Sequence, residues 1–194
     1  MSKPDLLAAL EPVIDVLERL GVRYQVGGSV ASSVHGMARA TMDVDIVAEL
    51  EAAHIGKLVG VLQEDYFVEE STVRSAVRDC SSFNLIHQGT MMKVDVFLPK
   101  QRRYDRQALA RSMNDTLVDD ADSRQIKFAA PEDVILAKLE WYRLGNETSE
   151  RQWADVLGVL RVQRNRLDLQ YLRRWAVELG VDDLLSRALS EVSS

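Results

Sequence analysis

The chain has 194 residues, of which 46% are hydrophobic and 28% charged, a balance typical of a folded globular protein. The net charge of −6 argues against a surface that binds long stretches of nucleic acid, although a local basic patch is compatible with it. One cysteine, Cys80, and three scattered histidines exclude an internal disulfide and a zinc site. Because no apolar run is long enough for a membrane span or a signal peptide, we expect a cytoplasmic protein without membrane contact.

The first half of the chain alternates predicted helices and strands. Hydrophobic residues at three- and four-residue spacing predict a helix over 4–20, which Gly21 ends. A short strand over 23–26 leads to one or two helical turns over 29–35. Alternation rich in Val and Ile predicts a strand over 41–48. A helix follows over 51–63, and its inward residues are Ile55, Leu58, Val59 and Leu62.

The second half changes from mixed structure to helices. We expect a strand over 67–69 and a short helix capped by Ser71 that ends near Cys80. Strands over 82–87 and 92–98 should pair antiparallel, and 125–128 is a last strand. The predicted helices are 131–144, 149–162, 168–179 and 181–190. Residues 1–130 are thus expected to form an α/β core with an N-terminal helix, and 131–194 a helical part packed on it.

Three acidic residues lie in predicted strands. Residues i and i+2 of a strand point to the same face, so the carboxylates of Asp43 and Asp45 project together. Two adjacent like charges are unfavourable without a cation, and Mg²⁺ or Mn²⁺ prefers such oxygen ligands. Asp95 stands between two valines in a later strand, with Lys93 on its face. If the two strands are neighbours, the three carboxylates converge as metal ligands.

A glycine pair precedes these carboxylates in the chain. Gly27 and Gly28 follow a predicted strand, and without β-carbons they let backbone N–H groups approach phosphate oxygens. Ser29 adds a hydroxyl at the start of the next helix. A phosphate cradle together with a divalent-metal cluster is the apparatus of nucleotidyl or phosphoryl transfer.

Each of these features also has a structural interpretation. A glycine pair after a strand is commonly a turn, and Asp43 and Asp45 could form a solvated strand face. Asp95 could be structural, and Lys93 could face solvent, balance Asp95 or bind a phosphate. The three segments in this order favour the chemical interpretation over the separate structural ones.

Charged and aromatic residues elsewhere have open or structural interpretations. Lys138 either lays its stem along an apolar helix face or meets a carboxylate or phosphate. Asp155 is expected to pair with Arg151 at i, i+4, and His35 and His87 to be non-catalytic. Basic stretches over 100–111 and 161–174 are solvated helix faces or RNA-docking surfaces. The residues expected in core or helix packing are Trp141, Trp153 and Trp175.

The order Gly-Gly-Ser (27–29), Asp-Val-Asp-Ile (43–46) and Val-Asp-Val (94–96) resembles the nucleotidyltransferase superfamily, whose catalytic core is of the DNA polymerase β type. The closer resemblance is to its bacterial AbiEii-like branch, the abortive-infection toxin type. In that branch an Arg and a Thr, here Arg39 and Thr41, precede the Asp pair. Residues 131–139 and 150–157 also resemble this branch, so the likeness covers roughly 22–160. The 14 residues between Gly28 and Asp43 are at the upper edge of the core pattern and ordinary for the toxin branch.

The resemblance implies an α/β (α+β) fold with a nucleotidyltransferase-type mixed sheet flanked by helices and a C-terminal helical segment. It implies that Asp43 and Asp45 bind the metals, Mg²⁺ or Mn²⁺, and that Asp95 binds the second metal and is, or assists, the base. Gly28 and Ser29 would hold the β- and γ-phosphates of a nucleoside triphosphate. The whole set expected to bind nucleotide is Gly27, Gly28, Ser29, Arg39, Thr41, Lys93, Lys138 and Arg151.

The function expected from the resemblance is metal-dependent transfer of NMP from an NTP to a hydroxyl of RNA or protein. The implied partners are the nucleoside triphosphate, the RNA or protein acceptor and a cognate antitoxin protein. A second interpretation is a catalytically inactive nucleotide-binding, antitoxin-like or regulatory module with the same fold. A third, weaker one is a metal-dependent phosphohydrolase, whose usual His-Asp clusters the sequence lacks.

Overall fold

The computed structural model describes residues 3–41, 43–117 and 123–193. The chain divides into two compact units. The first comprises Met1–Gly27 and Ala40–Phe128, and the second comprises Gly28–Arg39 and Ala129–Ser194. The first unit holds the strands and the second is helical. The mixed α/β architecture predicted from the sequence is therefore confirmed.

A mixed sheet organises the first unit. Its described residues form seven strands in the order β3-β4-β5-β2-β1-β7-β6. β2 and β5 run parallel at the centre, whereas β4 and β5 pair antiparallel as the sequence predicts. The edge strand β6 has no counterpart among the predicted strands. The strands are β1 (Tyr24–Val26), β2 (Asp43–Ala48), β3 (Tyr66–Phe67), β4 (Ser82–His87), β5 (Lys93–Phe97), β6 (Met113–Asp115) and β7 (Ile126–Phe128).

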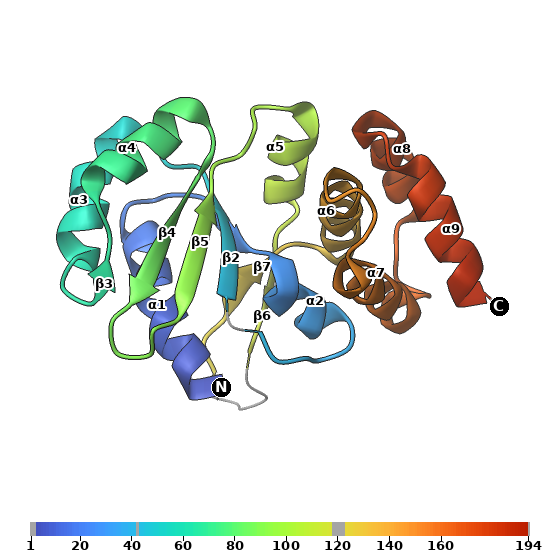
Figure 1. The fold of residues 1–194 in the computed structure, drawn as a ribbon, viewed down its shortest axis with the longest axis horizontal. Helices are drawn as coiled ribbons and strands as arrows, with labels where there is room; N and C mark the ends of the chain where they lie inside the picture. Colours follow the sequence, from blue (N-terminus) through green and yellow to red (C-terminus); the bar gives the residue numbers. More distant parts are fainter. Residues whose placement is uncertain (1–2, 42, 118–122, 194) are drawn as a thin grey trace. The chain divides into compact units, whose positions relative to one another are not determined.

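Helices of the first unit cover the apolar face of this sheet. α1 (Lys3–Arg19) contacts β2, β5 and α3 (Ala52–Leu62), as Figure 1 shows. The centre of the stripe predicted for α1 is buried, with Leu10 and Leu17 at 0% exposure, whereas Leu6 and Leu20 at its ends are partly buried. Gly21 after the helix has a φ of 68°. α4 (Glu70–Asp79) has Glu69 as its N-cap, so the prediction that Ser71 caps it is wrong. α5 (Arg103–Ala110) completes the helices of the unit's described residues.

The second unit joins one early helix to the C-terminal helices. α2 (Gly28–His35) packs against α6 (Pro131–Leu144) and α7 (Glu150–Gln163). α8 (Leu169–Leu179) and α9 (Asp182–Ser193) complete it. Serine and aspartate caps begin α7 and α8, because Ser149 and Asp168 each accept a backbone N–H three residues on. No helix in the described part of the chain has the length and apolar character to cross a bilayer.

The tryptophans of the second unit do not all pack as predicted. Trp153 and Trp175 are buried, at 9% and 3% exposure. Trp141 is 54% exposed, so its predicted place in the core is wrong. It lies on the exposed face of the last turn of α6, whereas the next residue, Tyr142, is buried at 6% exposure.

Candidate active site

The acidic residues of β2 and β5 share one face of the sheet. Along β2, Val44 and Ile46 are fully buried, whereas the alternating Asp43 and Asp45 are only partly buried. β5 lies beside β2 in parallel register, with Asp95 directly opposite Asp45. Side chains opposite one another on paired strands project from the same face. The pairing therefore places the three carboxylates on one face of two neighbouring strands.

The ammonium of Lys93 lies among these carboxylates. Lys93 stands opposite Asp43, and its Nζ is 2.7 Å from Oδ2 of Asp95. The hydrogen bond to Asp95 raises the pKa of Lys93 above its usual range, against the opposing effect of burial. Attraction from Asp43 and Asp45 acts in the same direction as the hydrogen bond. Of the roles left open for Lys93, the structure shows the one in which it balances Asp95.

Local hydrogen bonds fix the backbone around the two β2 aspartates. The Thr41 hydroxyl donates to Oδ1 of Asp43 at 2.8 Å, and its oxygen lies 3.1 Å from the Asp43 carbonyl. The Gly27 N–H donates to the carbonyl of Asp45 at 2.8 Å, which extends the β1–β2 ladder by one residue. The chain is thus held beside Asp45 at Gly27, and α2 begins at the next residue, Gly28.

The carboxylates fit a divalent metal by their chemistry rather than by their present arrangement. Among the described residues, no three His, Cys, Asp or Glu side chains are placed so that they could hold a metal ion as they stand. Partly buried aspartate oxygens are nevertheless the donors that Mg²⁺ and Mn²⁺ prefer. In this structure Lys93 engages Asp95 and Thr41 engages Asp43. A metal would therefore have to replace contacts that the chain makes within itself.

A second charged cluster lies in the second unit around Asp155 of α7. Arg39 donates two hydrogen bonds of 2.9 Å, one to each carboxylate oxygen of Asp155. Lys138 of α6 donates a third, of 2.7 Å, to Oδ2. Arg39 also donates to the hydroxyl of Ser29. The cluster thus brings two cationic side chains and the Ser29 hydroxyl together around one carboxylate.

Burial and charge act in opposite directions on Asp155. The side chains of Asp155 and Lys138 are each 6% exposed, and that of Arg39 is 26% exposed. Burial alone raises the pKa of the Asp155 carboxyl, but the hydrogen bonds and charges of Arg39 and Lys138 outweigh it and hold this pKa below its ordinary value. Asp155 is therefore ionised at neutral pH, and it keeps both cations in place.

Two glycines allow the local geometry of this cluster. Gly36 follows α2, and a β-carbon there would lie 2.9 Å from both the carbonyl oxygen of Ser32 and the amide nitrogen of Val159 in α7. Only glycine lets the chain pass this close to α7 before it reaches Arg39. At the other end of α2, Gly28 has a φ of 54°, in the left-handed region that favours glycine.

Asp155 is a site residue that sequence reasoning missed. The expected pair with Arg151 on the same helix is wrong, because Asp155 pairs instead with Arg39, 116 positions away, and with Lys138. Arg151 is exposed near the start of α7, and the structure does not bring it into the cluster. No local pattern could have identified Arg39 as the partner, since the contact depends on how α2 packs on α7.

Other polar residues have structural roles or lie at the edge of the candidate site. A ring nitrogen of His35 is 2.7 Å from the carbonyl of Ala129, and a ring nitrogen of His87 is 2.9 Å from the Thr90 hydroxyl. Each histidine thus has a hydrogen-bonding partner within the fold, and their expected non-catalytic character stays a prediction. Asn84 of β4 stands opposite Asp95 and was not singled out from the sequence.

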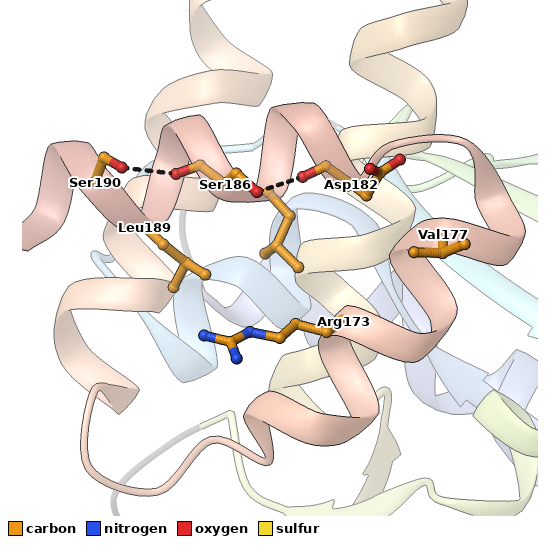
Figure 2. A pocket seen from close by; sticks show the side chains of 7 residues that line it. Arg173, Val177, Asp182, Ser186, Leu189 and Ser190 are labelled. Atoms are coloured by element: carbon orange, nitrogen blue, oxygen red, sulfur yellow. Dashed lines mark hydrogen bonds between the residues drawn. The ribbon is translucent and has the colours of Figure 1, made fainter.

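A pocket of about 390 Å³ lies between α8 and α9 (Figure 2). Its lining includes none of the β2 and β5 aspartates and none of the residues around Asp155. Its lining includes Arg173 and Val177 of α8 and Ser186 and Ser190 of α9. The hydroxyls of Ser186 and Ser190 each donate to a carbonyl one turn earlier in α9. They serve the helix, and the pocket adds no group to the proposed chemistry.

Comparison with solved structures identifies the fold. An antigenic nucleotidyltransferase-like protein from Paracoccidioides brasiliensis matches with a TM-score of 0.54 and 18% identity, over 98% of this chain and 94% of its own. The antibiotic-resistance protein ANT(2″)-Ia, in complex with adenylyl-2″-tobramycin, matches with a TM-score of 0.54 and 10% identity, over 90% and 97%. A putative nucleotidyltransferase from Thermotoga maritima matches with a TM-score of 0.50 and 18% identity, over 80% and 96%.

These likenesses show that the chain has the nucleotidyltransferase fold, as the sequence resemblance predicted. No protein-family model matches the sequence, and no curated protein matches it closely enough to count as a relative.

Proposed function

We propose that this chain is a metal-dependent nucleotidyltransferase, which moves NMP from a nucleoside triphosphate to a hydroxyl acceptor. One observation carries the proposal: Asp43 and Asp45 share a face of β2, with Asp95 in register on β5. The fold agrees with it, since proteins described as nucleotidyltransferases have the same fold. The acceptor in the ANT(2″)-Ia complex is an antibiotic, so the fold leaves the acceptor class of this chain open.

In the proposed reaction, the acceptor hydroxyl attacks the α-phosphorus of the nucleotide. A new bond forms between the acceptor oxygen and phosphorus, the bond to the bridging oxygen breaks, and pyrophosphate leaves. Asp95 takes, or helps to take, the proton of the acceptor hydroxyl. Asp43, Asp45 and Asp95 would hold Mg²⁺ or Mn²⁺, which when bound neutralises charge on the attacking and leaving oxygens.

The start of α2 and the Asp155 cluster would bind the triphosphate. Backbone N–H groups at Gly28 and the hydroxyl of Ser29 can donate to phosphate oxygens. Arg39 already donates to Ser29 and is held in place by Asp155. Arg151, at the exposed start of α7, would serve the acceptor rather than the phosphates.

Labelled transfer tests this function. Each of four α-³²P-labelled NTPs is incubated with Mg²⁺, total RNA and cell protein, with wild type beside Asp43→Asn and Asp45→Asn. We expect a labelled product with wild type and a loss of about a hundredfold or more in either variant. Asp65→Asn, an exposed aspartate in a turn of the same unit, is the matched control. Full transfer by Asp43→Asn would remove the proposed site.

A finer proposal follows from the AbiEii-like resemblance. We propose that the acceptor is a hydroxyl of RNA or of a protein side chain and that a cognate antitoxin restrains the activity. The same labelling experiment reports the acceptor class. Nuclease digestion removes a labelled RNA product, and protease digestion removes a labelled protein product. Label that resists both treatments would contradict this acceptor class while leaving the transferase itself in place.

A second candidate function is a non-catalytic module that binds nucleotide. The ion pair between Lys93 and Asp95 favours it, because a carboxylate held by an ammonium is withheld from a metal. Such a module would bind NTP, detected as a rise in melting temperature, and would give no labelled product under any condition. Metal-dependent label that is lost in Asp95→Asn would exclude it.

A further inference from the structure

The β2–β5 strand pair carries its own cation at the place where the proposed function needs a metal. We propose that Lys93 is the resident counter-ion of the three carboxylates in the metal-free protein, and that a divalent cation binds by displacing the Lys93 ammonium from Asp95. This inference rests on the proposed function, since it takes these carboxylates to be the metal ligands. It adds a role for Lys93 that differs from a direct phosphate contact.

The register and the distances support this assignment. Lys93 stands opposite Asp43 and two residues before Asp95 on the same strand face, with its Nζ 2.7 Å from Oδ2 of Asp95. Three carboxylates on one face would repel one another without a counter-charge. Lys93 supplies a positive charge to this face while the metal is absent. It thereby lets the strands keep three acidic residues in register.

The exposure of the two partners shows which of them can move. The Lys93 side chain is 45% exposed, whereas that of Asp95 is 18% exposed. A lysine ammonium on a flexible four-carbon stem can turn into solvent, but a partly buried aspartate on a central strand cannot. A metal entering the site would therefore keep Asp95 as a ligand and release Lys93. The released ammonium would remain at the rim of the site.

This competition has a measurable consequence for metal affinity. Every metal-binding event must first break the ion pair of Lys93 with Asp95, so the pair lowers the apparent affinity. Partly exposed pairs contribute little, and the expected penalty is roughly two- to fivefold in the dissociation constant. Removing the charge while keeping the length of the side chain should recover this factor.

Calorimetric titration with manganese chloride tests the proposal. The proteins are wild type, Lys93→Met and Lys57→Met, where Lys57 is an exposed lysine of α3 and gives the same change in net charge. We expect Lys93→Met to bind Mn²⁺ roughly two- to fivefold more tightly than wild type, and Lys57→Met to bind as wild type does. Without metal, Lys93→Met should melt at a lower temperature than Lys57→Met. Its rise in melting temperature on adding Mn²⁺ should be larger.

The possible results separate this inference from the function on which it rests. Equal or weaker Mn²⁺ binding by Lys93→Met, with binding by wild type, would overturn the counter-ion role and leave the metal site intact. No Mn²⁺ binding by wild type or by Lys93→Met would overturn both. If Lys93→Met does not fold, Lys93→Gln takes its place with the same expectation, because the amide is neutral but keeps a polar end.

Discussion

Asp155 holds Arg39 with both of its carboxylate oxygens, through two hydrogen bonds of 2.9 Å. Arg39 follows α2 and Asp155 lies in α7, so this one contact ties together segments 116 positions apart. A two-pronged pair of this kind fixes the plane of the guanidinium as well as its position. Lys138, buried beside it, shares the second oxygen at 2.7 Å.

Replacing Asp155 should therefore destabilise the protein. In Asp155→Asn, the buried Lys138 and the partly buried Arg39 lose the carboxylate charge that they share, and we expect a loss of about 3 kcal/mol in the free energy of unfolding. Urea denaturation followed by tryptophan fluorescence measures it, because all three tryptophans lie in the unit that contains Asp155. Glu178→Gln, an exposed change on α8, is the control and should stay within about 0.5 kcal/mol of wild type. A loss no larger than that of the control would contradict the prediction.

The same carboxyl should make stability depend on acidity. The pKa of Asp155 in the folded protein lies below its ordinary value, because the hydrogen bonds and charges of Arg39 and Lys138 outweigh the effect of burial. A lowered pKa adds stability that is present above the ordinary aspartate pKa of about 3.9 and is lost as the pH falls through the folded-state value. The difference in unfolding free energy between wild type and Asp155→Asn should thus be full at pH 7 and shrink below about pH 4. A difference that stays constant from pH 7 to pH 3 would refute this account.

Lys138→Met should cost less than Asp155→Asn. Without the ammonium, Asp155 and Arg39 remain as a neutral pair, and the methionine fills nearly the same volume in a buried place. Removing the charge of Asp155 instead takes the shared carboxylate away from both Arg39 and Lys138. We expect the loss for Lys138→Met to be about 1 to 2 kcal/mol, measured by the same urea denaturation. The reverse order of the two variants would show that the cluster is not governed by its charge balance.

Local signals in the sequence were enough to predict most helices and the paired strands. Each of these signals involves residues that are close together in the sequence. Examples are the apolar stripe that ends at Gly21, the alternation of Asp43 to Ile46 and the proline that begins α6. Alternation also predicted that Asp43 and Asp45 share a face, because the period of a strand does not depend on its neighbours. The parallel register of Asp45 with Asp95 needed the structure, since it depends on which strands become neighbours.

Features that depend on distant partners were not predictable. β6 spans three exposed residues, Met113–Asp115, which have no strand pattern of their own and are a strand only because they pair with β7. Asp155 has a nearby arginine on its own helix, and only the packing of α2 on α7 shows that Arg39 is the partner. Helical spacing placed Trp141 with aliphatic residues, but it could not show which face of the last turn of α6 is exposed, where Trp141 is 54% exposed and Tyr142 is 6% exposed.

Two tryptophan substitutions test the burial of Trp175 and the exposure of Trp141 in the second unit. Trp175 is 3% exposed and Trp141 is 54% exposed, so their removal should have unequal costs. We expect Trp175→Ala to lower the free energy of unfolding by about 3 to 5 kcal/mol, and Trp141→Ala by no more than about 1 kcal/mol. Urea denaturation followed by far-ultraviolet circular dichroism avoids the loss of fluorescence. Equal costs would mean that Trp141 is covered in the folded protein.

Gly36 tests the close approach that brings Arg39 to Asp155. In Gly36→Ala, the new β-carbon would lie 2.9 Å from the amide nitrogen of Val159 and 2.9 Å from the carbonyl of Ser32, and neither backbone atom can rotate away. The segment after α2 must then shift, which should cost about 1 to 3 kcal/mol and loosen the contact of Arg39 with Asp155. Gly56→Ala is the matched control, because Gly56 lies in α3 with no atom within 4 Å of its added β-carbon. This control should raise the free energy of unfolding by up to about 1 kcal/mol, because alanine favours the helix more than glycine does. The double variant Gly36→Ala/Asp155→Asn should lose less unfolding free energy than the sum of the losses in the two single variants. The reason is that Gly36→Ala already weakens the contact that Asp155→Asn removes. Strict additivity in the unfolding free energies would show that Gly36 and the ion pair act independently.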